Sequence, residues 1–210
     1  IKPLPEEEAK KVEIVRGPNI KFLPVPEVPV QHLKVPVSLK GGDNISTDDI
    51  TPASAEFSSM RSNIPLMSKY CYYRYDPEFS ERAREMGSSI IIGGENYGQG
   101  SSREHAAINP MYLGVRAVIA KSIARIHKGN LLNHGIIPMV FDDPADYDKL
   151  EMGDELEMGD LLNQMQTKVV EVRDNTRGIT FKARLELSEN ELEVISCGGQ
   201  LRYLKKQLGK

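Results

Sequence analysis

The most informative part of this chain is a short apolar run, Ser89-Ile90-Ile91-Ile92-Gly93-Gly94, with the polar segment that follows it, Gly98-Gln99-Gly100-Ser101-Ser102-Arg103-Glu104-His105. A run this short, rich in β-branched residues and bounded by glycines, predicts a buried strand. The polar segment predicts a helix from Ser102 to about Leu113, with Ser101 and Glu104 forming a capping box. Helix N-termini expose unpaired N–H groups and partial positive charge, so this connection favours an anionic ligand.

Strands and helices alternate around this run, which indicates right-handed βαβ units and a parallel sheet. Beyond residue 154 the pattern changes to short strands separated by turns, up to about residue 187. The expected elements are strands over 33–39, 89–92, 115–120 and 136–141, and helices over 78–86, 102–113, 123–133 and from Gly198-Gly199 onward.

The composition excludes several classes of protein. The chain has 210 residues, enough for one good core, and its net charge of -3 lacks the basic excess of nucleic-acid-binding domains. No apolar stretch approaches the roughly 20 residues of a transmembrane helix. The two cysteines are too few for a disulfide framework, a zinc site or an iron–sulfur cluster. We therefore expect a cytoplasmic protein with no metal of its own and neither a membrane nor a nucleic acid as partner.

The first 36 residues hold seven of the 13 prolines. Proline fixes φ and removes a backbone donor, so this stretch should be extended and poor in helix. We interpret residues 1–36 as a linker or extended N-terminal segment, with a disordered tail as the alternative, and residues 37–210 as one domain. Because the chain starts at Ile1 rather than at a methionine, we expect it to be a processed product or part of a longer protein.

The segment around Ser101 contains more than a helix cap requires. Gly98 and Gly100 allow the backbone to approach a ligand closely, and Arg103 can bind a carboxylate with two hydrogen bonds. A Walker loop would need a lysine after Gly100, and a dinucleotide-binding loop would need a glycine in place of Arg103, so both are rejected. Ser101, Ser102 and Arg103 remain as candidates for anion binding.

Other polar residues have simple structural interpretations beside functional ones. Asp48 and Asp49 fit an N-cap and turn, or a carboxylate that orients a serine or pairs with an arginine. His105 and His127 lie on predicted helices and are best explained as structural histidines with satisfied hydrogen bonds. Cys71 is interpreted as a packing residue.

Three segments together resemble one family. Residues 41–52 (GGDNISTDDITP), 94–107 (GENYGQGSSREHAA) and 121–138 (KSIARIHKGNLLNHGIIP) are similar, in this order, to the C-terminal swivelling domain of aconitases. The resemblance spans about residues 33–205. It implies an α/β fold, a swivelling β/β/α domain in which helices flank a partly open, barrel-like parallel or mixed sheet. Isopropylmalate dehydratases carry a similar domain as a separate small subunit, although residues 122–127 look more like aconitase.

Aconitases are hydro-lyases of the tricarboxylic acid cycle that interconvert citrate and isocitrate through cis-aconitate on a [4Fe–4S] cluster. The resemblance implies a tricarboxylate substrate, no cofactor on this chain, and cluster-bearing domains as partner, fused upstream or in a separate subunit. It implies that Ser101 is the general base, that Ser102 and Arg103 bind a substrate carboxylate, and that Asp48 supports the site. Arg61 is the candidate for a further substrate-binding arginine, although its spacing from Asp48 differs from the family pattern by about one residue.

The chain departs from the family pattern at two positions, which leave the exact substrate open. Asp49 stands where a histidine is often found, and Gln99 stands where many relatives have a cysteine or another polar residue. Two alternative functions also stay open. One is the small subunit of an isopropylmalate or homoaconitate dehydratase. The other is a non-catalytic RNA-binding or regulatory module, against which the acidic net charge counts.

Overall fold

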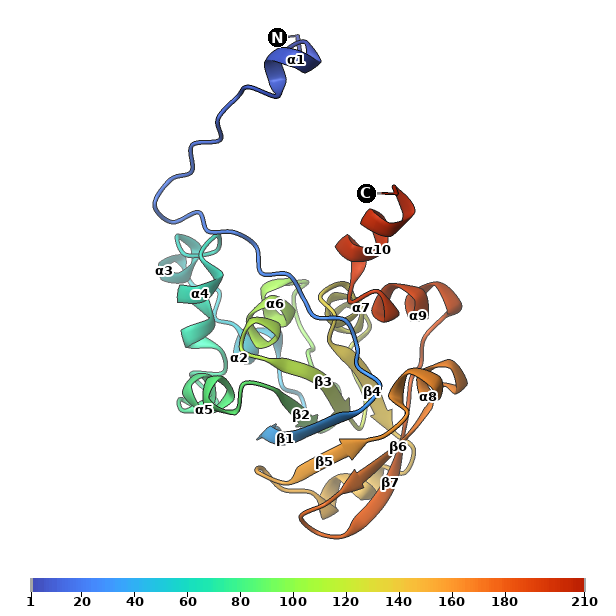
Figure 1. Cartoon of the computed structure of the whole chain (residues 1–210). Helices are drawn as coiled ribbons and strands as arrows, with labels where there is room; N and C mark the ends of the chain where they lie inside the picture. The colour runs from blue at the N-terminus through green and yellow to red at the C-terminus, as the bar shows by residue number, and fades with distance from the viewer. Residues whose placement is uncertain (1, 210) are drawn as a thin grey trace.

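The computed structural model describes residues 2–209, and a seven-stranded β-barrel forms its centre (Figure 1). The strands are β1 (Leu33–Lys40), β2 (Ser89–Gly93), β3 (Val115–Ala120), β4 (Ile137–Phe141), β5 (Glu155–Met158), β6 (Val169–Asp174) and β7 (Ile179–Arg184). The α-helices are α1 (Glu6–Ala9), α2 (Thr47–Ile50), α3 (Ala55–Ser58), α4 (Ile64–Met67), α5 (Phe79–Met86), α6 (His105–Tyr112), α7 (Arg125–Asn133), α8 (Leu161–Thr167), α9 (Glu189–Ser196) and α10 (Gln200–Gln207), with short 3-10 helices η1 (Ser68–Tyr70) and η2 (Pro144–Lys149).

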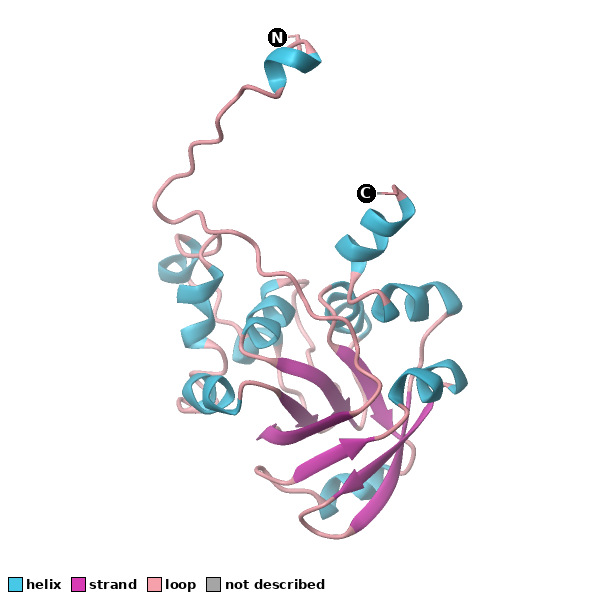
Figure 2. Cartoon of the chain, in the orientation of Figure 1, coloured by secondary structure: helices cyan, strands magenta, loops and turns pink. Residues whose placement is uncertain are grey.

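The barrel joins a parallel half to an antiparallel half (Figure 2). Strands β1 to β4 pair in parallel and in chain order, whereas β7, β6 and β5 pair antiparallel and return the sheet to β1. The four strands predicted before residue 142 and the barrel-like mixed sheet flanked by helices are thus confirmed. The barrel is closed rather than partly open, because β5 pairs with β1 from Leu33 opposite Met158 to Pro36 opposite Glu155.

Two apolar layers lie on the two faces of the sheet. Side chains alternate along a strand, so Ile90 and Ile92 belong to the barrel interior while Ile91 belongs to the layer beneath the helices. Helices α5, α6 and α7 pack on this outer face, against β1, β3 and β4 respectively. Burial of each such isoleucine contributes about 1.5–3 kcal/mol. The barrel interior is therefore a packed apolar core. A ligand site is to be sought in the loops at the ends of the strands.

A β-bulge interrupts the alternation in β1. The register between β1 and β2 shifts between Val37 and Leu39. Val37 faces the barrel interior, but Leu39, two residues later, packs with the outer layer. The extra residue of the bulge reverses which side chains face the barrel interior at the end of β1. This happens just before the chain enters the loop that leads to α2.

The segment before β1 is partly fixed to the helical layer. Within residues 2–32 the only helix or strand is α1. The Lys21 N–H donates to the Ser62 carbonyl over 2.9 Å, Arg116 forms an ion pair with Glu27 over 2.6 Å, and Arg202 Nε donates to the Pro26 carbonyl over 3.0 Å. These contacts join the extended segment to elements from three different parts of the chain.

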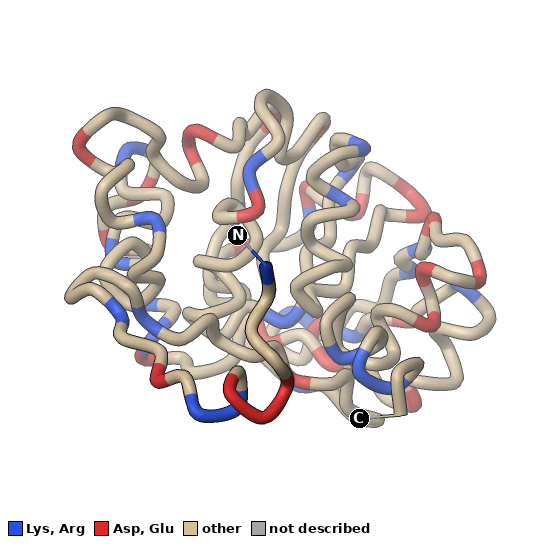
Figure 3. The backbone as a smooth tube through the Cα atoms, turned by 90° about the horizontal axis from the view of Figure 1, so that it is seen from above, with Lys and Arg blue, Asp and Glu red and all other residues tan. Residues whose placement is uncertain are grey.

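The surface shows no division into a basic and an acidic face. Figure 3 shows lysine and arginine interspersed with aspartate and glutamate over most of the backbone. Within residues 2–209, no helix has both the length and the apolar composition that crossing a membrane requires.

The loop after β2 lies against α7 through a contact that glycine permits. Gly98 has φ of 76°, and a Cβ added to it would lie 2.0 Å from Cδ2 of His127. His127 is 1% exposed and its ring lies 5.4 Å from that of Tyr97, centroid to centroid. The expectation of a satisfied histidine is wrong here, because neither ring nitrogen has a hydrogen-bond partner among residues 2–209. The imidazole acts as an aromatic packing surface for the loop.

We predict that Gly98→Ala lowers the free energy of unfolding by about 2 kcal/mol or more, because the methyl group would overlap the His127 ring at a backbone conformation that L residues rarely adopt. Denaturant unfolding followed by circular dichroism measures the change. Gly129→Ala is the matched control, since a Cβ at this position in α7 meets nothing within 4 Å. There the same methyl group should stabilise the helix by about 0.5–1 kcal/mol. Equal effects at the two positions would contradict close packing at Gly98.

Stability should also depend on pH through His127, because burial lowers its pKa from 6.5 to about 4. Between these values the unfolded chain binds a proton that the folded chain does not, so folding becomes less favourable as the pH falls from 6.5 towards 4. From pH 8 to pH 5 this amounts to a loss of about 2 kcal/mol. His134, whose pKa is also lowered by burial, acts in the same direction. The difference between wild type and His127→Phe isolates the effect, and parallel stability curves for the two proteins would exclude it.

Candidate functional site

Three loops lie side by side beyond the carboxyl ends of β1, β2 and β3. The sheet pairing continues into them through isolated parallel bridges, Ser46 with Gln99 and Tyr97 with Ile123. The Gly98 N–H donates to the Ile45 carbonyl over 2.7 Å, which joins the first loop to the second. Asp48 lies in the first of these loops, and the candidates Ser101–Arg103 lie in the second. Both loops are at the end of the parallel sheet where α/β folds tend to bind ligands.

Helix α6 begins later than predicted. Its N-cap is Glu104, which makes no side-chain capping bond, so the predicted capping box of Ser101 and Glu104 is wrong. The backbone at Ser101 is instead drawn to the neighbouring loop, where Thr47 Oγ1 donates to the Ser101 carbonyl over 3.0 Å. A capping box does occur in that loop, between Ser46 and Asp49 at the start of α2. Asp49 therefore takes part in the cap of α2 as its N3 residue, while the N-cap itself is Ser46.

The residues just before α6, together with its first residue, have unpaired backbone N–H groups. Within residues 2–209, the backbone N–H groups of residues 102–105 have no acceptor. Ser101 and Ser102 are exposed on the same segment, and Arg103 is about half-buried beside them. Two hydroxyls, a guanidinium and unpaired N–H groups are donors suited to a carboxylate.

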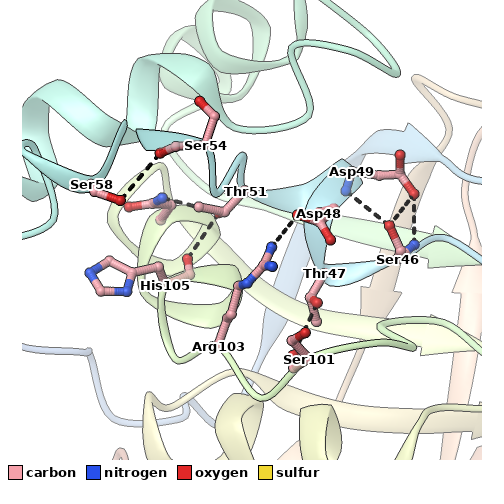
Figure 4. Close-up of polar contacts among 11 residues, drawn as sticks. Ser46, Thr47, Asp48, Asp49, Thr51, Ser54, Ser58, Ser101, Arg103 and His105 are labelled. Atoms are coloured by element: carbon pink, nitrogen blue, oxygen red, sulfur yellow. Dashed lines mark hydrogen bonds and ion pairs between the residues drawn. The ribbon is translucent and has the colours of Figure 1, made fainter. Parts of the chain in front are cut away.

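Arg103 forms an ion pair with Asp48 from the first loop (Figure 4). This confirms the hypothesis that one of the two aspartates pairs with an arginine. The contact involves one amino group, Nη1, and one carboxylate oxygen, Oδ1. A guanidinium has five N–H donors, so the rest of the group remains free to bind a second carboxylate.

A hollow of about 180 Å³ lies beside this segment, and its lining includes Arg61, Ser102, Arg103 and His105. Arg61 is exposed, and its carbonyl lies 3.0 Å from Nε2 of His105. The structure therefore brings four of the five predicted residues together on two adjoining loops, and the fifth, Arg61, lines the same hollow as Ser102 and Arg103. His105 has the hydrogen-bond partner that we expect of a structural histidine.

Iron–sulfur clusters are held by several cysteine or histidine side chains that lie close together. Within residues 2–209, no group of three or more His, Cys, Asp or Glu side chains lies close enough together to hold a metal ion. Cys71 is buried in the core, as its interpretation as a packing residue requires, and Cys197 follows α9. The donors on these loops suit the binding of an anion.

Sequence reasoning missed two residues at this site. Thr47 and Thr51 are buried, and their hydroxyls donate to the carbonyls of Ser101 and His105. A threonine among turn-forming residues carries no signal of such a role, because its partner is a backbone carbonyl of another loop.

Comparison with known proteins gives consistent relatives. A family model described as the aconitase C-terminal domain matches residues 68–144. The chain is 39% identical over 167 residues to the 3-isopropylmalate dehydratase small subunit 2 of Archaeoglobus fulgidus, a match that covers 80% of this chain and 92% of that protein. It is 40% identical over 125 residues to a probable mitochondrial aconitate hydratase of Dictyostelium discoideum, of which it spans only 16%.

The fold gives the same relationship. The structure is similar to a crystal structure of 3-isopropylmalate dehydratase from Methanocaldococcus jannaschii, with a TM-score of 0.71 and 31% sequence identity. The match covers 84% of this chain and 95% of the chain in that crystal structure. Because the likeness runs through nearly the whole of a small subunit, in sequence as in fold, the chain belongs to the aconitase family and corresponds to its C-terminal swivel domain.

Proposed function

We propose that the chain supplies the proton-transferring and carboxylate-binding half of a hydro-lyase that acts on a 2-hydroxy acid. The observation that carries this proposal is segment 101–105, where exposed serine hydroxyls, an arginine and unpaired N–H groups meet at the start of α6. The departure of the substrate hydroxyl is assigned to a cluster-bearing partner, in keeping with the family resemblance.

In this proposal Ser101 removes the carbon-bound proton. A serine hydroxyl is a weak base, because its alkoxide forms only where donors and positive charge surround it. Arg103 and the N-terminus of α6 provide both next to Ser101. Within residues 2–209 the Ser101 hydroxyl has no hydrogen-bond partner, so it is free to meet a substrate.

Carboxylate binding is assigned to Ser102, Arg103 and Arg61. Arg103 would bind a carboxylate through the N–H groups that Asp48 leaves unused. Asp48 then fixes the direction of the guanidinium and offsets part of its charge, while the N–H groups outside this one contact stay available to a substrate carboxylate. Arg61, which also lines the hollow, would bind a second carboxylate of the same molecule.

Within this reaction class we favour an isopropylmalate-type substrate and a separate cluster-bearing subunit. The support is the match to 92% of a small subunit that is named for 3-isopropylmalate dehydratase, against 16% of the length of an aconitate hydratase. The C-terminal domain of an aconitate hydratase, acting on citrate, is the second candidate, and a 30% identical match that covers 93% of this chain to a putative aconitate hydratase of Aspergillus fumigatus supports it.

The first test is an assay of the complete enzyme, this chain with its cluster-bearing half, on 2-isopropylmalate and on citrate. We expect kcat/KM to be roughly tenfold or more higher for 2-isopropylmalate, because substrates with a different side group are discriminated by this order. A preference for citrate would select the second candidate. The chain alone should show no turnover of either compound, and activity without the partner would contradict the division of labour proposed here.

The second test concerns the base. In the complete enzyme, Ser101→Ala should lower kcat by about 10²–10⁴-fold and change KM little, because proton transfer is lost while carboxylate binding stays. Ser102→Ala is the matched control: it removes the same hydroxyl one residue away and should act mainly on KM. Steady-state kinetics separate the two effects. A kcat for Ser101→Ala within about threefold of wild type would rule out Ser101 as the base.

A further inference from the structure

Helix α2 and its C-cap residue, Thr51, make three contacts with segment 101–105 (Figure 4). Thr47 Oγ1 donates to the Ser101 carbonyl over 3.0 Å, and Thr51 Oγ1 donates to the His105 carbonyl over 3.2 Å. Between them, Asp48 pairs with Arg103. The two donors, Thr47 and Thr51, are four residues apart. Their acceptors, the carbonyls of Ser101 and His105, are also four residues apart, on the segment that carries the candidate site.

Both threonines are built into the core rather than placed at the surface. Thr47 is 2% exposed and Thr51 is 1% exposed. The Thr51 N–H donates to the Thr47 carbonyl over 3.0 Å, so the two residues are held at a fixed separation. Asn109, fully buried in α6, donates from Nδ2 to Thr51 Oγ1 over 3.1 Å and orients that hydroxyl towards His105.

The contact at Thr47 has two further supports. Its N–H donates to the Gln99 carbonyl over 2.8 Å, two residues before Ser101. Gly100, at φ of 106°, brings the backbone so close that an added Cβ would lie 3.3 Å from Thr47 Oγ1. Thr47 therefore holds the chain on both sides of Gly100, the residue whose positive φ sets the direction in which Ser101 leaves the loop.

From this geometry we infer that Thr47 and Thr51 are positioning residues for the proposed reaction, which clamp the two ends of segment 101–105 and so fix the Ser101 hydroxyl and the Arg103 guanidinium. The inference rests on the proposed function for its catalytic consequence, but the clamp itself is a property of the folded chain. Exposed serines on a short segment outside a helix would otherwise sample many orientations, and a displacement of about 1 Å can cost about 10²-fold in rate.

Valine and serine replacements separate the hydroxyl from the shape of threonine. Thr47→Val keeps the branched shape but leaves the Ser101 carbonyl without its donor, whereas Thr47→Ser keeps the donor. In the complete enzyme we expect Thr47→Val to lower kcat by about 10–100-fold and to raise KM as well, because the Ser101 hydroxyl and the Arg103 guanidinium both lose their positions. Thr47→Ser should stay within about threefold of wild type in both constants. Thr51→Val and Thr51→Ser form a second, independent pair with the same expected pattern.

Amide hydrogen exchange of the chain tests the clamp without the reaction. Ala106 and Ala107 donate their N–H groups to the carbonyls of Arg103 and Glu104, within the clamped segment. Their amides should exchange about tenfold or more faster in Thr47→Val than in wild type, while those of β2 and β3 stay unchanged. Ser58→Ala is the control, because Ser58 also donates a hydroxyl hydrogen bond to a carbonyl, that of Ser54 over 3.2 Å, but on α3 and without contact to the segment. It should change neither exchange nor kcat.

The outcomes distinguish the clamp from the proposed reaction. Unchanged exchange of the Ala106 and Ala107 amides in both valine variants would overturn the clamp, whatever the enzyme does. An equal loss of kcat in Thr47→Val and Thr47→Ser would overturn it as well, since packing of the methyl group would then explain the effect. Wild-type enzyme that turns over neither 2-isopropylmalate nor citrate would refute the proposed substrates, and faster exchange in the valine variants would still support the clamp.

Discussion

The candidate site depends on hydrogen bonds that extend the parallel sheet past the last residues of its strands. The Gly98 N–H to the Ile45 carbonyl and the Ala124 N–H to the Tyr97 carbonyl join three loops that are far apart in the sequence. Each loop leaves the carboxyl end of its own strand, so the barrel sets the order of the loops in space. Asp48 and Arg103 can meet because of this order, and neither loop would place its side chain without the other.

The strands were accessible to sequence reasoning because their signal is local. β3 has the predicted limits, Val115–Ala120, and β2 differs from its prediction by one residue. The bulge in β1 and the late start of α6 were not accessible, since each depends on a neighbour distant in sequence. For α6 this neighbour is Thr47, whose bond to the Ser101 carbonyl holds the backbone out of the first helical turn.

The same distinction applies to the site. Ser101, Ser102, Arg103 and Asp48 were predicted because reactive and charged side chains stand out beside glycines, and the structure brings them together. Their roles remain predictions. Thr47 and Thr51 were missed because a buried hydroxyl that supports a carbonyl has the same sequence pattern as any turn-forming threonine. His127 shows the converse, a residue with possible chemistry that serves as a packing surface.

Closure of the barrel leaves the central sheet without an edge. An open sheet ends in strands with unpaired N–H and C=O groups, along which other chains can add and aggregate. Here the pairing of β5 with β1 leaves every strand among residues 2–209 with a neighbour on both sides. The barrel therefore presents loops and side chains to its surroundings rather than an exposed backbone ladder. Its sheet offers no edge along which a second copy of the chain could add a strand.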